Sequence, residues 1–132
     1  MTPFGEKLRE LRRERGVTQG QMAAALRVSS AYLSALEHGR RGRPSWDFLQ
    51  RVITYLNVIW DDAEELQRLA ALSHPKVSVD TGGLSPEATA LANRLSETVA
   101  ILAPEDISAL LAQLEEAAAR AEALRRAKRQ RR

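Results

Sequence analysis

The feature that most constrains the fold is the stretch over residues 18–39, which reads TQGQMAAALRVSSAYLSALEHG. It contains two short runs of apolar residues at helical spacing, and a helix-capping residue precedes each run. Thr18 and Gln21 form the pattern of a capping box before the first run, and Ser29 precedes the second. Gly39 follows the second run and adopts positive φ without a steric penalty. The stretch therefore predicts two short helices joined by a tight turn.

Three further helices are predicted around this stretch, within residues 1–74. The first begins after Thr2, with proline at its first position, and ends at Gly16. A fourth begins after Ser45, behind the arginine-rich loop RRGRP, and a fifth begins with Asp61 as its cap. The apolar positions expected in the core from these last two helices are Phe48, Leu49, Val52, Ile53, Leu56, Leu66, Leu69, Ala70 and Leu72.

The rest of the chain predicts a linker, a helical hairpin and a basic tail. Residues 75–84, PKVSVDTGGL, combine proline, glycine and small polar residues, as linkers do. Two helices that begin near Pro86 and Pro104 form a predicted dimerisation hairpin over residues 85–125, and residues 126–132 are expected to fray into the tail. The apolar residues expected at the dimer contact are Leu91, Leu95, Val99, Leu102, Ile107, Leu110, Leu114 and Leu124.

Composition argues against several classes of function. Aromatic residues make up only 5% of the chain, while Ala and Leu are abundant, which favours a core built from helices. The absence of cysteine excludes disulfides and thiolate metal sites. No apolar run approaches the roughly 20 residues that cross a bilayer, so we expect a cytoplasmic protein without a membrane partner. No nucleophile–base pair, phosphate-binding glycine loop or metal-ligand cluster is present, so we predict no catalytic residue, metal site or cofactor.

The net charge of +3 conceals an uneven distribution. Residues 77–119 hold seven acidic residues and one basic residue, whereas residues 120–132 hold seven basic residues and one acidic residue. An acidic segment repels phosphate, whereas either basic end of the chain could contact nucleic acid. The basic end is open to two interpretations, a solvated tail or a second contact with DNA or another acidic surface.

Two short helices joined by three or four residues fit a helix-turn-helix, whose second helix enters the major groove of DNA. The stretch over residues 15–45, RGVTQGQMAAALRVSSAYLSALEHGRRGRPS, resembles the Xre/Cro/phage-repressor family. The residues that carry the resemblance are Thr18, Gln19, Ala23, Leu33, Leu36, Glu37 and Gly39. It covers residues 1 to about 74 and implies an all-α, five-helix, lambda-repressor-like DNA-binding domain, followed here by the two-helix hairpin.

The resemblance also implies roles for single residues. Gln19, at the start of the second helix, would contact a phosphate and brace the recognition helix that enters the groove, and Glu37 would pair with Arg12 as an exposed structural brace. Ser29, Ser30, Ala31 and Ala35 would face the groove, with Tyr32 and Ser34 beside them, and the residues after the helix would meet the DNA backbone. The full set implied at the DNA is Gln19, Arg27, Ser29, Ser30, Ala31, Tyr32, Ser34, Ala35, His38, Arg40, Arg41 and Arg43.

The sequence departs from that family at two places. Arg27 stands in the turn where glycine is common, and left-handed backbone costs a non-glycine residue on the order of 1 kcal/mol. The groove-facing side chains are small, and neither serine nor alanine makes a bidentate base contact. We therefore expect much of the affinity to come from phosphates and part of the specificity from DNA shape or from the loop arginines.

These observations predict a sequence-specific, dimeric transcriptional repressor that reads a pseudopalindromic site on double-stranded DNA and is associated with the nucleoid. Two alternatives use the same DNA-binding domain. In the first, the chain is an antitoxin whose C-terminal segment neutralises a toxin. In the second, it is an adaptor whose hairpin recruits RNA polymerase or another regulator, so the identity of any protein partner stays open.

Overall fold

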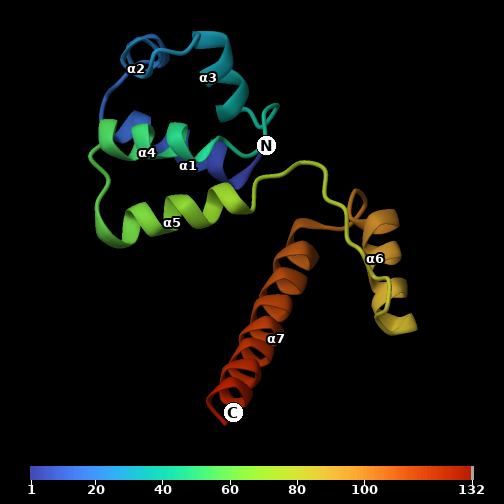
Figure 1. The fold of residues 1–132 in the computed structure, drawn as a ribbon. Coiled ribbons are helices and arrows are strands. Elements are labelled where there is room, and N and C mark those ends of the chain that lie inside the picture. The colour runs from blue at the N-terminus through green and yellow to red at the C-terminus, as the bar shows by residue number, and fades with distance from the viewer. Residues whose placement is uncertain (132) are drawn as a thin grey trace. The chain divides into compact units, whose positions relative to one another are not determined.

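The computed structural model describes residues 1–131, which form seven helices and no strand (Figure 1). This confirms the all-α prediction. The chain divides into two compact units, residues 1–78 and the residues from 79 onward, and the division falls inside the predicted linker. The helices are α1 Pro3–Glu14, α2 Gln19–Leu26, α3 Ser30–Glu37, α4 Trp46–Tyr55, α5 Trp60–Ala71, α6 Pro86–Thr98 and α7 Pro104–Gln130.

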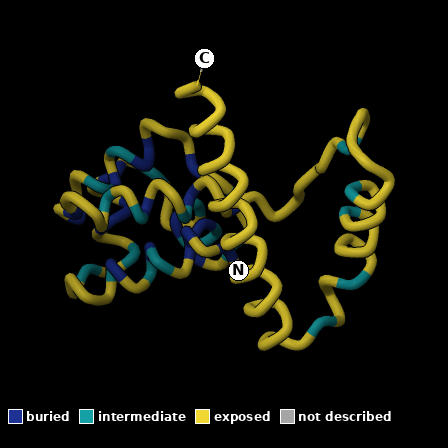
Figure 2. Tube along the Cα trace, turned by 90° about the horizontal axis from the view of Figure 1, so that it is seen from below, coloured by how far each residue is buried: buried dark blue, intermediate teal, exposed yellow. Residues whose placement is uncertain are grey.

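The N-terminal unit is organised around one apolar core. Helix α1 packs against α3 and α5, while α2 packs against α3 and α4. Figure 2 shows that the buried residues are confined to this unit. Its largest fully buried apolar side chains come from all five helices and the turn after α4: Phe4, Leu8, Met22, Leu33, Leu36, Val52, Leu56 and Leu66.

The caps predicted for α1, α2 and α3 are present. Thr18 Oγ1 accepts a hydrogen bond from the Gln21 amide at 3.0 Å, and Gln21 Oε1 accepts one from the Thr18 amide at 3.0 Å, which completes the capping box. Ser29 Oγ accepts from the amide of Tyr32 at 3.0 Å. Thr2 caps α1 in the same way. Each cap satisfies a backbone N–H that has no partner within its helix, so the ends of these helices are set by local sequence.

Two predictions about α5 are wrong. The helix begins at Trp60 behind Ile59, so Asp61 lies in its first turn and is not its cap. Leu72 lies just beyond the end of the helix and is 53% exposed, whereas Ser73 is buried in its place. The Ser73 hydroxyl accepts a hydrogen bond from the Phe4 amide at 2.9 Å, which ties the end of α5 to the start of α1.

A glycine permits close packing of α1 on α3. A Cβ atom added to Gly5 would lie 2.1 Å from the carbonyl oxygen of Leu36 and 3.1 Å from that of Glu37. Because these are backbone atoms, they cannot rotate away as the end of a flexible side chain would. Gly5 therefore lets the first turn of α1 approach the last turn of α3.

The C-terminal unit consists of α6 and α7, and neither helix contains a buried residue. The close helix–helix packings of the described chain all lie among α1 to α5, so α6 and α7 do not form a tightly packed pair. Helix α7 continues to Gln130, so the prediction that residues 126–132 fray is wrong for its described part. Ala, Arg, Lys and Gln are strong helix formers, and cations are favourable at a helix C-terminus.

Candidate nucleic-acid interface

The two central helices are joined by a tight turn. Arg27 lies in it with φ 58° and ψ 42°, which is left-handed backbone, as its position in the sequence predicted. The amide of Val28 donates to the carbonyl oxygen of Ala23 at 3.0 Å, closing the end of α2. Ser29 then caps α3, so only three residues separate the helices. This is the predicted helix-turn-helix, with the side chain of Arg27 exposed at its corner.

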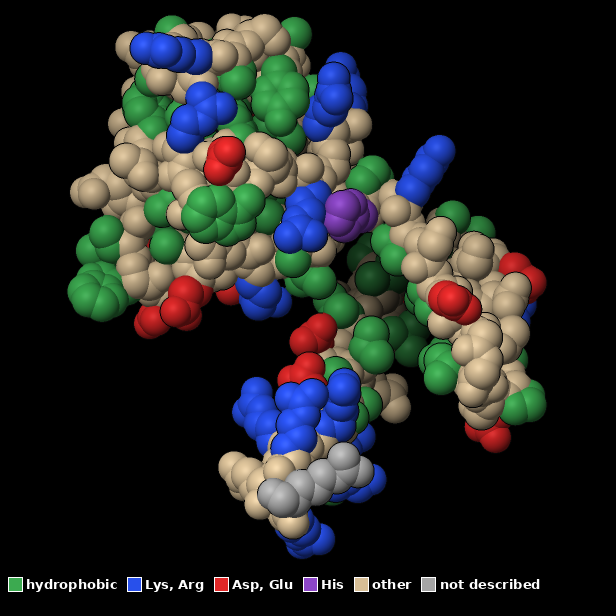
Figure 3. Space-filling view, in the orientation of Figure 1, with side chains coloured by type: hydrophobic (Ala, Val, Ile, Leu, Met, Phe, Trp, Pro, Cys, Tyr) green, Lys and Arg blue, Asp and Glu red, His purple; other side chains and the backbone are tan. Residues whose placement is uncertain are grey.

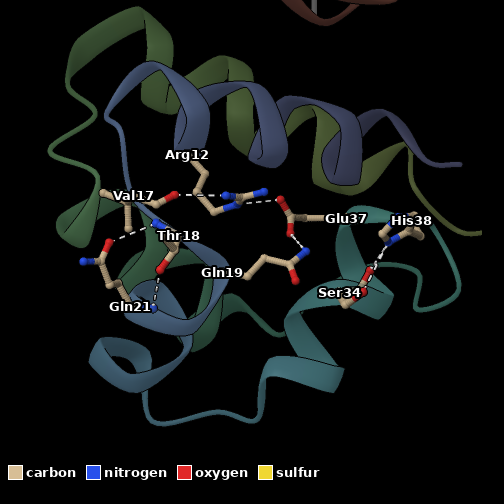
Figure 4. Close-up of polar contacts among 8 residues, drawn as sticks. All are labelled: Arg12, Val17, Thr18, Gln19, Gln21, Ser34, Glu37 and His38. Atoms are coloured by element: carbon tan, nitrogen blue, oxygen red, sulfur yellow. Dashed lines mark hydrogen bonds and ion pairs between the residues drawn. The ribbon is translucent and has the colours of Figure 1, made fainter.

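A buried carboxylate connects the first three helices (Figure 4). Glu37 on α3 is fully buried, and its Oε1 accepts a hydrogen bond from Arg12 Nε of α1 at 2.8 Å. Its Oε2 accepts a second from Gln19 Nε2 of α2. Arg12 also donates from Nη1 to the carbonyl oxygen of Val17 at 2.9 Å. The Arg12–Glu37 pair is therefore present but buried, where an exposed pair was predicted, and Gln19 contributes to the same brace.

The first half of α3 presents small side chains to solvent. Ser29, Ser30 and Ala31 are exposed, and Ala35 is half-buried one turn later. Tyr32 has a second role, because its ring meets that of Phe48 edge-on, with centroids 5.5 Å apart. The surface offers hydroxyl and methyl groups and no long polar side chain, so a groove could approach the backbone of α3 closely.

The end of α3 carries a polar pair. His38 Nδ1 lies 2.8 Å from the carbonyl oxygen of Ser34 and 3.3 Å from its hydroxyl. His38 is exposed and Ser34 is half-buried. The contact folds the imidazole back on the last turn of the helix.

The arginine loop, defined as residues 40–43, is held on both sides by close packing. Gly39, at φ +76°, precedes it, and a Cβ atom there would lie 2.5 Å from Met1 Cα. A Cβ atom on Gly42 would lie 2.7 Å from Pro75 Cδ. The amides of Arg40 and Arg41 both donate to the carbonyl oxygen of Ala35, at 2.9 and 3.2 Å. The two ends of the domain thus fix the backbone of the loop beside α3.

The side chains of this loop point outward. Arg40, Arg41 and Arg43 are exposed, as is Arg27, and none of the four makes an ion pair within the described residues. The guanidinium of Arg41 lies 5.7 Å from the centroid of the Tyr32 ring, which orients it along α3. Figure 3 shows several Lys and Arg side chains over the N-terminal unit. Cations without carboxylate partners are suited to binding phosphate.

The described residues show no sign of two other kinds of site. No group of three or more His, Asp or Glu side chains within residues 1–131 is arranged to hold a metal ion. None of the described helices combines the length and apolar character needed to cross a membrane.

Comparison with known proteins points to the same region. The helix-turn-helix domain family matches residues 3–69. The chain is 40% identical over 62 residues to the uncharacterized HTH-type transcriptional regulator RghRB of Bacillus subtilis, covering 47% of this chain and 45% of that protein. It is 38% identical over 61 residues to the HTH-type transcriptional repressor RghR of the same organism, covering 46% and 45%. The chain thus spans about half the length of the curated relatives it matches.

A solved structure is similar over about half of the chain. The crystal structure of the master regulator for biofilm formation SinR in complex with DNA covers 48% of this chain and 97% of that chain, with 28% identity and a TM-score of 0.44. The family match covers half of the chain and coincides with the two capped helices, the left-handed turn and the buried brace described above. The chain therefore belongs to the helix-turn-helix family, as a member of its Xre/Cro type.

Proposed function

We propose that this protein is a transcriptional regulator that binds double-stranded DNA and inserts α3 into the major groove. The observation that carries the proposal is the exposed, small-sided face of α3 beside four arginines that have no acidic partner in the described structure. The names of the relatives, a transcriptional regulator and a transcriptional repressor, support it. Such a regulator acts on the nucleoid in the cytoplasm.

Phosphate contacts are proposed to supply most of the affinity. Arg27 at the turn and the arginines of the loop flank α3, where the DNA backbone passes on either side of the groove. Gln19 is proposed to contact a phosphate as well, although its side-chain amide also donates to Glu37. Ser30 and Ala31 would lie nearest the bases, and a thymine methyl group is the contact that alanine offers.

Removing two loop arginines tests the proposal. Changing Arg40 and Arg41 to alanine is expected to weaken binding to all DNA sequences similarly and to flatten the slope of log K against log salt by about 2, because each phosphate contact contributes roughly 0.9. Fluorescence anisotropy with labelled duplexes over a range of salt concentrations measures both effects.

The matched control removes the same charge from α1, by changing Arg9 and Arg13 to alanine. This variant should keep both the affinity and the salt slope of the unchanged protein, because α1 is not part of the proposed interface. An equal loss in both variants would show that net charge alone governs binding and would contradict the assignment of the loop.

We also propose that the protein acts as a homodimer on a pseudopalindromic site, as a repressor. The support is the exposed apolar surface of α6 and α7, where Leu91, Leu114 and Leu124 are 69%, 59% and 65% exposed. Sedimentation equilibrium at micromolar concentration should give twice the chain mass of 14.7 kDa. A monomer mass would favour a different protein on this surface, as the antitoxin and adaptor alternatives require.

A further inference from the structure

Helix α7 carries an apolar stripe that nothing in the described chain covers. The helix is 27 residues long, which corresponds to about 40 Å at 1.5 Å per residue. Along it, residues at heptad spacing form one face. The α7 stripe is defined as Ile107, Leu110, Leu114, Ala117, Ala121 and Leu124, all of them exposed. A stripe of this length requires a partner surface that is equally long and apolar.

The charges on α7 are divided between its two ends. Residues 104–119 contain four acidic residues and no basic residue, and residues 120–130 contain five basic residues and one acidic residue. Figure 3 shows the Lys and Arg side chains gathered over the C-terminal part of this helix. The two halves therefore carry charges of −4 and +4. A partner that covers the whole stripe therefore lies along negative charge in the N-terminal half of α7 and along positive charge in its C-terminal half.

A second α7 in the opposite direction satisfies this requirement. In an antiparallel pair the acidic half of each helix lies along the basic half of the other, and the helix dipoles are also opposed favourably. In a parallel pair four acids would lie along four acids, and like charges on facing helices are destabilising. We propose that α7 forms an antiparallel pair with α7 of a second copy of this chain, an inference that rests on the homodimer proposed above.

The apolar stripe selects one register for this pair. Aligning Ile107 with Leu124 of the second copy matches every stripe residue with another stripe residue. The three layers, each formed twice, are Ile107 on Leu124, Leu110 on Ala121, and Leu114 on Ala117. Moving the register by one heptad in one direction brings Leu110 against Lys128, and in the other direction leaves Leu124 without a partner. Leucine opposite alanine in the inner layers also lets the helices approach closely without overpacking.

The same register aligns specific charges. Glu105 and Asp106 come to the same level along the pair as Arg126 and Arg125 of the second copy. Two-fold symmetry repeats this at the other end, so segments of opposite charge lie at the same level at both ends of the apolar layers. The basic end of α7 thereby serves to recognise the acidic start of α7 in the second copy.

Cysteine cross-linking in the full chain tests the direction and the register. The natural sequence has no cysteine, so each introduced thiol is the only one in its chain. Chains with Ile107→Cys and chains with Leu124→Cys are prepared separately and oxidised in a glutathione buffer, alone and mixed. The antiparallel pair predicts covalent dimers from the mixture and little from either variant alone, since facing positions come within disulfide reach only in the mixture.

Three outcomes would overturn the inference in different ways. Self-linking of the Ile107→Cys variant alone would show a parallel pair. Absence of links in both samples, with a dimer mass in solution, would show that the dimer forms through another surface. A monomer mass for the unchanged chain would remove the homodimer itself, whereas the DNA-binding assay tests the α3 face independently.

Charge exchange provides a second measurement that does not depend on thiols. Changing Glu105 and Asp106 to arginine should raise the dimer dissociation constant by at least about tenfold, and changing Arg125 and Arg126 to glutamate should do the same. Combining all four substitutions should restore dimerisation, because the two ends that lie at the same level again carry opposite charges. Unchanged dimerisation in the second variant with weaker DNA binding would show that the basic end contacts DNA and would overturn the pairing.

Discussion

Replacing Gly5 with alanine is expected to lower the free energy of unfolding of the N-terminal unit by about 3 kcal/mol, although alanine is the better helix former. The added Cβ would lie 2.1 Å from the carbonyl oxygen of Leu36, so α1 and α3 would have to separate. The separation would also disturb the core beneath, where Phe4 and Leu36 are buried. Urea denaturation followed by far-UV circular dichroism measures the change, because α1 to α5 lose their helical signal when this unit unfolds.

The matched control is the same substitution at Gly20, in α2. A Cβ there would have Thr18 Oγ1, at 3.9 Å, as its nearest neighbour, so alanine fits without displacement. Gly20→Ala should therefore stabilise the unit by about 0.5–1 kcal/mol, through reduced backbone entropy of the unfolded chain. The two substitutions are chemically identical and should change stability in opposite directions. Equal effects at both positions would contradict the close approach of α1 to α3.

Replacing Glu37 with alanine should destabilise the N-terminal unit by about 3–5 kcal/mol, the usual effect of removing one partner from a buried ion pair. The side chain of Arg12 is only 13% exposed, so its charge would remain largely away from water without a carboxylate beside it. The side-chain amide of Gln19 would lose its acceptor as well. Denaturation of the full chain, monitored by the same circular dichroism signal, measures the loss.

Two comparison variants separate the effect of burying the ion pair from the effect of removing a carboxylate. Glu65 forms a pair with Arg68 at 2.9 Å, but both side chains are well exposed, so Glu65→Ala should change stability much less. The double change Arg12→Met with Glu37→Leu should recover much of the loss, because apolar side chains of similar size can replace a buried pair. A double variant as unstable as Glu37→Ala would show that the loss does not come from the unpaired charge.

Much of the N-terminal unit could be predicted because its signals are local. The caps at Thr18 and Ser29, and the apolar spacing between them, depend on residues within one or two turns of each other. The resemblance to a known family indicated Arg12 and Glu37 as a pair across the fold. The start of α5 could not be read in this way, because the chain enters the helix at Trp60 with no capping side chain.

The features that escaped prediction depend on contacts between distant parts of the chain. The complete burial of Glu37 follows from the packing of α3 on α1 and α2, and periodicity does not reveal how deep a polar residue lies. Gly5 gives no sequence signal, because a glycine in a first turn is not unusual. Sequence reasoning ended α7 at its basic residues, but residues with high helix propensity extend it to Gln130.

The packing of Gly42 against Pro75 also has a consequence for how the two positions can change in evolution. These two positions are far apart in the sequence, yet the proline ring occupies the space that a side chain at position 42 would need. A related protein with a larger residue at position 42 would need a residue other than proline at position 75. Otherwise Arg41 and Arg43, which flank position 42, would have to move. Substitutions at the two positions should therefore covary among related proteins, and the covariation would record selection on the DNA contact proposed for the loop, which neither residue makes itself.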